Sequence, residues 1–291
     1  MIELFATTAI WGLSFALAKK ALNRLHPLEL VTLRLFLGAV TATIIGRLRN
    51  RPNVERRALL PILLGVFEFA GTYILYTWSL KFLPSGVVGT LTLSTSALIF
   101  VVALVAGVQK FRVEALAGTV LSIVGAFFCL PAGGALSGLT PSSEALIGGG
   151  LIMASNLMFA IGNVAISKFQ VPGASDPNAT ASGLWIGALL SAIVCAASGA
   201  YDHPHELSVQ ALALPLYLGI VPTGLGFTLW NQGVEKTSAL KASFIFNFKA
   251  PLALICGWLL LGEKLNPRLA LGLVLLVLAT RMIRKKPQTL L

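Results

Sequence analysis

The chain is a succession of long apolar stretches, separated by short gaps that hold most of its charged residues. A helix needs roughly 20 residues to cross a hydrocarbon core of about 30 Å. Cutting the chain at the charged, polar and proline-rich gaps predicts ten membrane-spanning helices, at 3–22, 28–47, 58–80, 85–108, 113–131, 146–168, 179–200, 209–234, 238–262 and 267–284. Because these spans nearly fill the sequence, we predict an all-α integral membrane protein with short loops.

The composition changes which functions are plausible. Of the 291 residues, 56% are hydrophobic and only 11% are charged, whereas soluble domains carry about 25% charged residues. So few charges argue against a soluble enzyme, a nucleic-acid-binding protein and a disordered chain. The net charge of +11 would suggest a nucleic-acid partner in a soluble protein, but most of these cations lie in the gaps between apolar stretches.

The distribution of Lys and Arg predicts the orientation, since cytoplasmic loops are enriched in both residues. With the N-terminus inside, 14 of the 22 Lys and Arg fall in cytoplasmic segments and 6 in external loops. We therefore expect both termini in the cytoplasm. The cluster of Lys19, Lys20 and Arg24 runs against the rule, because this orientation places it outside.

The chain divides into two similar halves. Residues 131–144 are rich in Pro, Gly and Ser and lack a cation, as expected of an external linker, so we predict a first five-helix repeat at 1–132, a linker at 133–145 and a second five-helix repeat at 146–291. A shift of 154 residues lays Gly65–Gly118 onto Gly219–Gly272 without a gap. Five is an odd number of spans, so the second repeat must be inverted, an architecture typical of secondary transporters with a midplane substrate site.

Several short motifs stand out along both halves of the chain: Trp11-Gly12 with Phe15 and Lys19, His26-Pro27-Leu28-Glu29-Leu30 with Arg34, Leu80 to Gly86, Pro251, and Gly257 to Lys264 followed by Gly272. Together they resemble the EamA-type members of the drug/metabolite transporter superfamily. The resemblance extends over both halves and implies a ten-helix carrier that moves small metabolites, commonly outward, through a cavity between the halves. The first half departs from the pattern where Ala97 and Gln109 stand at the positions equivalent to Pro251 and Glu263.

Three charged side chains fall inside the predicted spans, where each costs at least about 2.5–3.5 kcal/mol and usually faces a cavity or a partner. Glu68 lies near the centre of the third span, Lys249 near the centre of the ninth, and Arg34 outward of the centre of the second. Glu68 is a candidate proton carrier or counter-ion, Lys249 a candidate anchor for a carboxylate or phosphate, and Arg34 a candidate substrate contact. The alternatives are a static Glu68–Lys249 ion pair and a structural role for Arg34.

Helical spacing selects the neighbours of these charges. In a regular helix Thr72 and Tyr76 share the face of Glu68, at i+4 and i+8, and Phe246 shares a face with Lys249. We therefore add Thr72, Tyr76 and Phe246 to the candidate substrate-binding residues.

The eighth span contributes a further aromatic candidate and a candidate hinge. Thr223, Phe227 and Trp230 form a stripe, of which Trp230 is a candidate substrate contact, although aromatic stripes more often pack against lipid or core. Pro222 lies among glycines that include Gly224, and a proline inside a helix removes a backbone hydrogen bond. Pro222 and Gly224 are therefore predicted to form a hinge.

The spans hold no set of residues that suggests catalysis or metal binding. No HExxH occurs, the three histidines fall at external loops, and no GxxxxGK[ST] motif for ATP is present. We predict no enzyme activity, no cofactor, no metal and no nucleic-acid partner.

The sequence instead predicts a secondary transporter in a bacterial-type inner membrane. The family resemblance implies that it moves an amino acid or a related amphipathic metabolite outward, and we expect alternating access with a proton or a counter-substrate as a candidate coupling partner. An exchanger of organic anions or phosphorylated metabolites anchored by Lys249 is the alternative, and an intramembrane enzyme is disfavoured.

Overall fold

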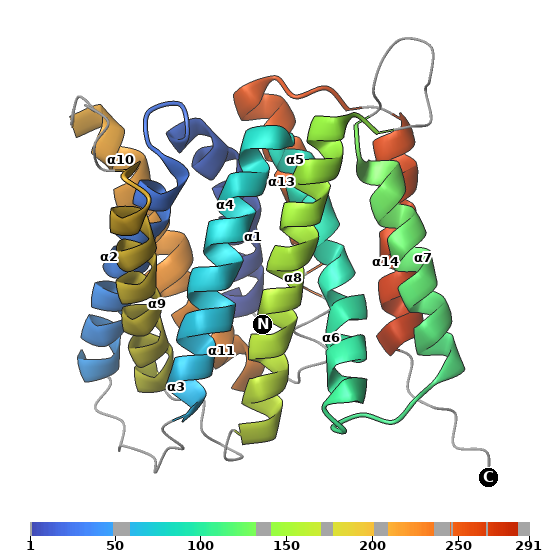
Figure 1. Ribbon diagram of the computed structural model, residues 1–291, viewed down its shortest axis with the longest axis horizontal. Helices are drawn as coiled ribbons and strands as arrows, with labels where there is room; N and C mark the ends of the chain where they lie inside the picture. The colour runs from blue at the N-terminus through green and yellow to red at the C-terminus, as the bar shows by residue number, and fades with distance from the viewer. Residues whose placement is uncertain are drawn as a thin grey trace.

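The computed structural model describes residues 2–48, 59–131, 141–169, 177–200, 209–235, 245, 247–265 and 267–284. These residues form helices and short connections, with no β-strand among them. Figure 1 shows the long helices running side by side between two ends of the molecule, as in a helical bundle. The all-α prediction is confirmed for this part of the chain.

The first half of the chain contains two helical stretches whose geometry changes along their length. Leu64–Gly71 is a π-helical segment, in which backbone hydrogen bonds span five residues instead of four, and Thr92–Ser94 is a single 3₁₀ turn. The elements are α1 (Ile2–Ala21), α2 (Pro27–Leu48), α3 (Leu59–Leu63), η1 (Leu64–Gly71), α4 (Thr72–Phe82), α5 (Ser85–Leu91), η2 (Thr92–Ser94), α6 (Thr95–Val105) and α7 (Val113–Cys129).

The second half contains a second π-helical segment, again in the middle of a long helical stretch. Its elements are α8 (Ser143–Phe169), α9 (Pro177–Ala197), α10 (Val209–Leu218), η4 (Gly219–Leu225), α11 (Gly226–Glu235), α13 (Lys249–Leu261) and α14 (Pro267–Arg284). The observed bounds agree with the predicted stretches to within a few residues. The exception is the beginning of the ninth stretch, most of which lies outside the described residues.

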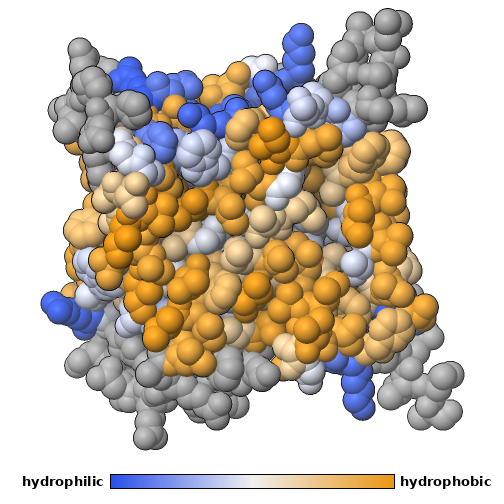
Figure 2. Space-filling model, viewed as in Figure 1, coloured by the Kyte–Doolittle hydropathy of each residue, from blue (hydrophilic) through white to orange (hydrophobic). Residues whose placement is uncertain are grey.

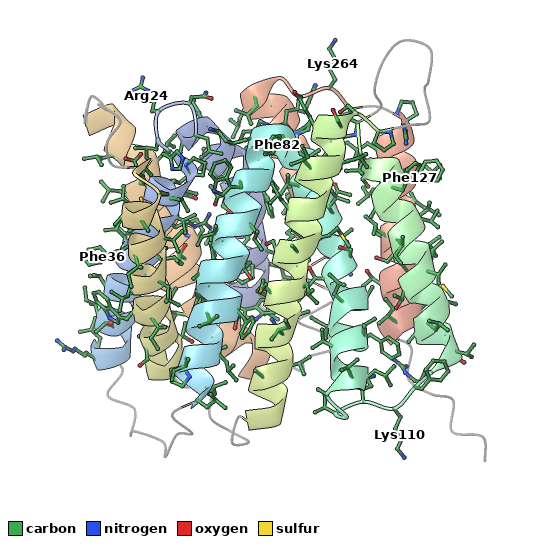
Figure 3. All side chains as sticks on the ribbon, in the orientation of Figure 1. Arg24, Phe36, Phe82, Lys110, Phe127 and Lys264 are labelled. Atoms are coloured by element: carbon green, nitrogen blue, oxygen red, sulfur yellow. The ribbon has the colours of Figure 1, made fainter. Side chains whose placement is uncertain are left out.

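The surface of the bundle is suited to lipid. Among the described residues, seven helices are long and apolar enough to cross a membrane, and Val113–Cys129 and Lys249–Leu261 are shorter apolar helices. Figure 2 shows a broad hydrophobic surface with hydrophilic residues towards the two ends. Arg24 and Lys264 lie at one end and Lys110 at the other (Figure 3). Such a large exposed apolar surface is expected of a protein embedded in a membrane.

Glycines allow two pairs of helices to pack with little space between their backbones. At the α7–α14 contact, a Cβ on Gly272 would lie 2.5 Å from Cys129 Sγ, and one on Gly118 would lie 2.8 Å from the carbonyl oxygen of Ala279. At the α2–η4 contact, a Cβ on Gly224 would lie 2.4 Å from Thr41 Cβ. Small residues at these positions permit the close approach on which helix packing in membranes depends.

Equivalent contacts recur at a spacing of 154 residues. The two π-helical segments begin at Leu64 and Gly219, so they differ from this spacing by one residue. A Cβ on Gly65 would lie 2.5 Å from the Ile186 side chain of α9, and a Cβ on Gly219 would lie 2.5 Å from the Leu37 side chain of α2. Each π-helical segment therefore packs through a glycine against a helix of the other half.

Candidate functional site

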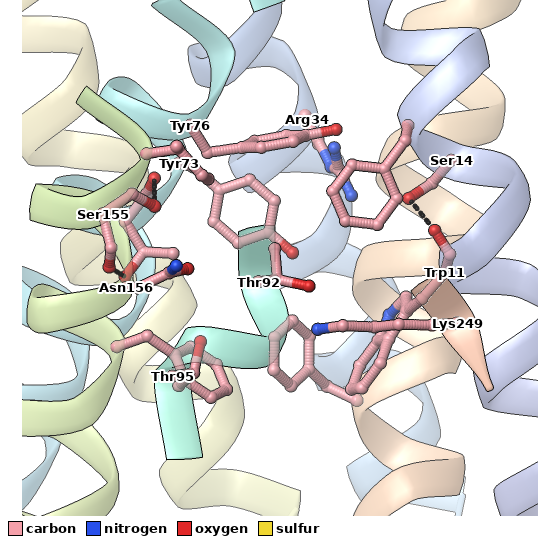
Figure 4. Close-up of a pocket in the computed structure, with 15 residues that line it drawn as sticks. Trp11, Ser14, Arg34, Tyr73, Tyr76, Thr92, Thr95, Ser155, Asn156 and Lys249 are labelled. Carbon is pink, nitrogen blue, oxygen red and sulfur yellow. Dashed lines mark hydrogen bonds between the residues drawn. The ribbon is translucent and has the colours of Figure 1, made fainter. Parts of the chain in front are cut away.

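A cavity of about 90 Å³ lies between the helices of the bundle. Figure 4 shows side chains converging on it from several helices. Its described walls come from α1, α2, α4, η2 and α6 in the first half and from α8, α11 and α13 in the second. The cavity is thus enclosed by elements of both halves.

Arg34 is the most constrained charged residue of this cavity. It lies on α2 and is only 3% exposed. Its Nε–H donates a 2.9 Å hydrogen bond to Thr223 Oγ1 of η4, and its guanidinium carbon lies 4.5 Å from the ring centroid of Tyr73. The Nη1 nitrogen is buried without a hydrogen-bond partner. A buried donor left unpaired costs free energy, and here it belongs to a cation.

A second unpaired donor lies beside the first. The hydroxyl of Tyr76 is buried and has no hydrogen-bond partner, and the ring centroid of Tyr76 lies 6.0 Å from the guanidinium carbon of Arg34. Phe15 packs edge-on against the Tyr76 ring at 5.4 Å. Figure 4 shows the hydroxyl end of Tyr76 on the same side of the cavity as Arg34.

The wall formed by α8 has its donors already paired. Both N–H groups of the Asn156 amide are used, one to the Leu91 carbonyl and one to Ser94 Oγ, each at 3.0 Å. Ser155 Oγ donates to the Thr72 carbonyl at 2.9 Å. This wall therefore joins α8 to α4, α5 and η2, and the donors of the Ser155 and Asn156 side chains are already used in these contacts.

Aromatic side chains cover much of the remaining wall. Trp11 donates from Nε1 to the carbonyl of Pro222 at 2.8 Å, which joins α1 to η4. Its ring lies 5.1 Å from that of Phe227 and 5.5 Å from that of Trp230. Trp11 and Phe227 line the cavity, whereas Trp230 lies outside the lining and packs against Trp11.

Of the seven predicted substrate-binding residues, four line this cavity, two do not, and one lies outside the described residues. Arg34, Thr72, Tyr76 and Lys249 contribute to its wall, and Lys249 is only 7% exposed. Glu68 and Trp230 are not among the lining residues. The prediction for Phe246 falls outside the described residues.

Glu68 differs from the expectation because it lies outside the cavity wall. It belongs to the π-helical segment η1, whereas Thr72 and Tyr76 belong to α4. It packs against α8, where a Cβ on Gly162 would lie 2.8 Å from Glu68 Cβ. No ion pair joins Glu68 to Lys249, so the static pair considered from the sequence is absent between these two described residues.

The backbone around Pro222 is also arranged differently from the expectation. In a regular helix, proline would leave the carbonyl of Leu218 without its donor. In η4 that carbonyl accepts a 2.9 Å hydrogen bond from Thr223 Oγ1, the same hydroxyl that accepts from Arg34. Thr223 thereby connects the irregular turn of η4 to the guanidinium in the cavity.

Charged groups also secure the end of the bundle at which Lys264 lies. The Glu263 carboxylate accepts the backbone N–H of Ser85 at 2.6 Å and that of Gly86 at 2.9 Å, which caps the N-terminus of α5. Lys19 Nζ donates to the carbonyls of Leu80 and Leu83 at 2.9 and 2.6 Å. The connection between α4 and α5 is thus held from both α1 and the end of α13.

Sequence reasoning missed several lining residues, among them Trp11, Tyr73, Asn156 and Phe227. Only Trp11 belongs to a motif that carries the family resemblance. Within the described residues, no group of three or more His, Cys, Asp or Glu is placed to hold a metal ion.

Comparison with known proteins identifies the relatives of this chain. The model of the EamA-like transporter family matches residues 1–130 and again residues 146–284. The chain is 27% identical to the uncharacterized transporter YoaV of Bacillus subtilis, covering 95% of this chain and 93% of the relative. It is also 27% identical to a probable amino-acid metabolite efflux pump of Salmonella typhimurium, covering 92% and 89%.

The fold also has a counterpart among solved structures. One crystal structure matches with a TM-score of 0.68 at 18% sequence identity, covering 97% of this chain and 94% of the other. At this identity the match concerns the fold alone.

Proposed function

The chain belongs to the EamA-like transporter family, and on that premise we propose that it is a secondary transporter that moves a small metabolite through the central cavity by alternating access. As a member of this family it is a multi-pass membrane protein and not an enzyme. Beyond membership of the family, we propose the arrangement of the spans, the substrate-binding site, the class of substrate and the direction of transport.

The proposed architecture is ten spans in two inverted repeats, residues 1–132 and 146–291, joined by a linker at 133–145. Two separate matches of one family model, one in each half, support it. The 154-residue spacing is a second support, because Gly65 and Gly219 approach helices of the opposite half in the same way. The long, lipid-suited helices support an inner-membrane location, for which we propose that both termini are cytoplasmic.

One observation carries the functional proposal: both halves enclose a cavity in which buried donors have no protein partner. The Arg34 Nη1 and the Tyr76 hydroxyl are such donors, and Lys249 lies in the same wall. Buried polar groups are normally paired, so unpaired ones facing a cavity suggest that a ligand completes them. A charge at membrane depth is in addition a functional-site candidate.

Alternating access requires the two halves to move relative to each other around this cavity. The π-helical segments η1 and η4 are irregular, and each packs against a helix of the other half. We assign the hinge to η4, around Pro222 and Gly224, whose backbone is joined to the cavity through Trp11 and Thr223. Glu68, buried in η1 away from the cavity wall, is assigned to proton coupling instead of substrate contact.

The first candidate substrate is an amino acid or a related amphipathic metabolite, moved outward. The name of the efflux-pump relative supports this candidate. The second candidate is an organic anion or phosphorylated metabolite exchanged for another, with Lys249 as an anchor. The presence of two buried basic side chains, Arg34 and Lys249, among the described lining residues supports the second candidate.

Counterflow in proteoliposomes tests the transport function. Vesicles preloaded with unlabelled metabolite should accumulate external labelled metabolite above equilibrium if the protein is a carrier, and the uptake should saturate. Flux that rises linearly with concentration without counterflow would indicate a channel and overturn the proposal. The coupling partner would be identified by comparing the uptake rate under a proton gradient, with an opposing metabolite, and with neither.

Side-specific labelling tests the topology. In a variant without the native cysteines, Lys110→Cys and Lys264→Cys should react with an impermeant maleimide from opposite sides of the membrane, with Lys264→Cys labelled from outside. These residues are exposed at opposite ends of the bundle (Figure 3). Labelling of both from one side would overturn the ten-span arrangement.

A further inference from the structure

The charges facing the cavity differ from those that an amino acid would require. Among the described lining residues, Arg34 and Lys249 are the basic side chains, and none of these lining residues is an acid. The two buried acids among the described residues, Glu29 and Glu68, are both outside the lining. A zwitterionic substrate would bring an ammonium group that finds no carboxylate in the described part of this wall, whereas an anion would find the guanidinium of Arg34.

The unpaired donors indicate where an anion binds. Arg34 is fixed by Thr223 through Nε and by the face of Tyr73, so its remaining guanidinium edge is held in one orientation. Nη1 and the Tyr76 hydroxyl are the two buried donors of the lining without a partner. A guanidinium edge matches the geometry of a carboxylate, and hydrogen bonds between ionised groups are stronger than neutral ones.

The opposite wall has the reverse chemistry. Asn156 donates both amide hydrogens to α5 and η2, which leaves Oδ1 as the only polar atom of this side chain without a protein partner. Oδ1 can only accept, so it suits an N–H or O–H group. Figure 4 shows Asn156 and Arg34 on opposite sides of the cavity, with aromatic rings around the space between them.

From this arrangement we infer that the substrate is an organic carboxylate without an ammonium group, with a flat apolar body and a hydrogen-bond donor at its far end. The carboxylate binds Arg34 Nη1 and the Tyr76 hydroxyl, the body lies among Trp11, Tyr73 and Phe227, and the distal donor reaches Asn156 Oδ1. Thr223 acts as a positioning residue for Arg34. The inference rests on the proposed transport function and refines its substrate class.

Four compounds that share a phenylethyl unit test this specificity. 3-(4-Hydroxyphenyl)propionate has all three features, 3-phenylpropionate lacks the distal hydroxyl, tyrosine adds an ammonium group, and tyramine has the ammonium but no carboxylate. Binding to the purified full-length protein is measured by isothermal titration calorimetry. We expect 3-(4-hydroxyphenyl)propionate to bind at least about tenfold more tightly than tyrosine or tyramine, and 3-phenylpropionate to lose about three- to tenfold, the loss expected for one hydrogen bond.

Variants connect this specificity to the named atoms. Arg34→Gln should weaken binding of 3-(4-hydroxyphenyl)propionate at least about tenfold, and Arg34→Lys should retain part of the affinity, because it keeps the charge but not the fork. Thr223→Val keeps the cation but releases its orientation, so it should reduce the preference for carboxylates over tyramine. Arg112→Gln is the control, since Arg112 lies outside the cavity, and its binding should equal that of the parent. Circular dichroism and size-exclusion chromatography check that each variant is folded.

The outcomes separate this inference from the transport proposal. Three results would overturn the inference. They are tighter binding of tyrosine or tyramine than of 3-(4-hydroxyphenyl)propionate, undiminished binding by folded Arg34→Gln, and no binding of any of the four compounds at about 10 mM, a concentration that would reveal even a dissociation constant of about 1 mM. Each of those results leaves counterflow of another metabolite open to direct measurement. Selective binding of the carboxylates with no counterflow of any metabolite would instead overturn the transport function.

Discussion

Removal of the Glu263 carboxylate should loosen the end of the bundle where α1, α4, α5 and α13 meet. The two oxygens of this side chain accept the backbone N–H groups of Ser85 and Gly86 at 2.6 and 2.9 Å. The first N–H groups of a helix have no partner within the helix. The carboxylate therefore supplies the acceptors that α5 lacks, from a position 178 residues away in the chain.

The expected loss follows from these two hydrogen bonds. A hydrogen bond to a charged group contributes about 1.5–3 kcal/mol in soluble proteins, whereas hydrogen bonds between membrane helices average about 0.6 kcal/mol. Because Glu263 is only half-buried, water can replace part of the interaction. We expect Glu263→Ala to lower the free energy of unfolding by about 2–4 kcal/mol, between the two bounds.

The conservative variant should retain half of the interaction. Glu263→Gln keeps one carbonyl oxygen but turns an NH₂ group towards the second backbone donor, so we expect a loss of about 1–2 kcal/mol, that of one such hydrogen bond. Unfolding by SDS in mixed micelles, followed by circular dichroism, measures both losses. Glu114→Ala is the control, because Glu114 is an exposed acid in the first turn of α7 and should change stability by less than about 1 kcal/mol. Parent-like stability of Glu263→Ala, or equal losses in both Glu263 variants, would refute the capping role.

Three further predictions concern the interior. Trp11→Phe removes the 2.8 Å hydrogen bond to η4 and should slow counterflow, with a stability loss of about 1 kcal/mol or less; an unchanged counterflow rate would contradict the link between α1 and the hinge. Gly272→Ala should destabilise the α7–α14 contact by about 1–3 kcal/mol through overpacking, whereas Gly150→Ala, whose Cβ meets nothing within 4 Å, should be neutral or stabilising; SDS unfolding compares the pair, and equal effects would rule out the steric explanation. Glu68→Gln and Lys249→Met should have additive effects on unfolding within about 0.5 kcal/mol, because the residues form no ion pair; a double variant that recovers the stability of the parent would reveal coupling.

The helices and their apolar surface could be predicted from the sequence, because both depend on properties that are local in the chain. A run of apolar residues of sufficient length forms a helix in lipid, where each backbone group must be paired within its own segment. The same local cost explains why Arg34 and Lys249 could be selected as candidates before their surroundings were known. Charges inside apolar stretches are expensive wherever they occur, and both of these line the cavity.

Only the tertiary structure decided which residues meet in the cavity. The sequence reasoning placed Glu68 in one group with Thr72 and Tyr76, but Glu68 lies outside the cavity lining and packs against Gly162 of α8. Nothing in the sequence near Arg34 indicates that Thr223, 189 positions later, fixes its guanidinium. Such contacts depend on the rotation of each helix about its axis, which is set by close packing at glycines such as Gly38 and Gly219. Hydropathy specifies that a helix crosses the membrane, but the packing of side chains against neighbouring helices specifies which face it turns inward.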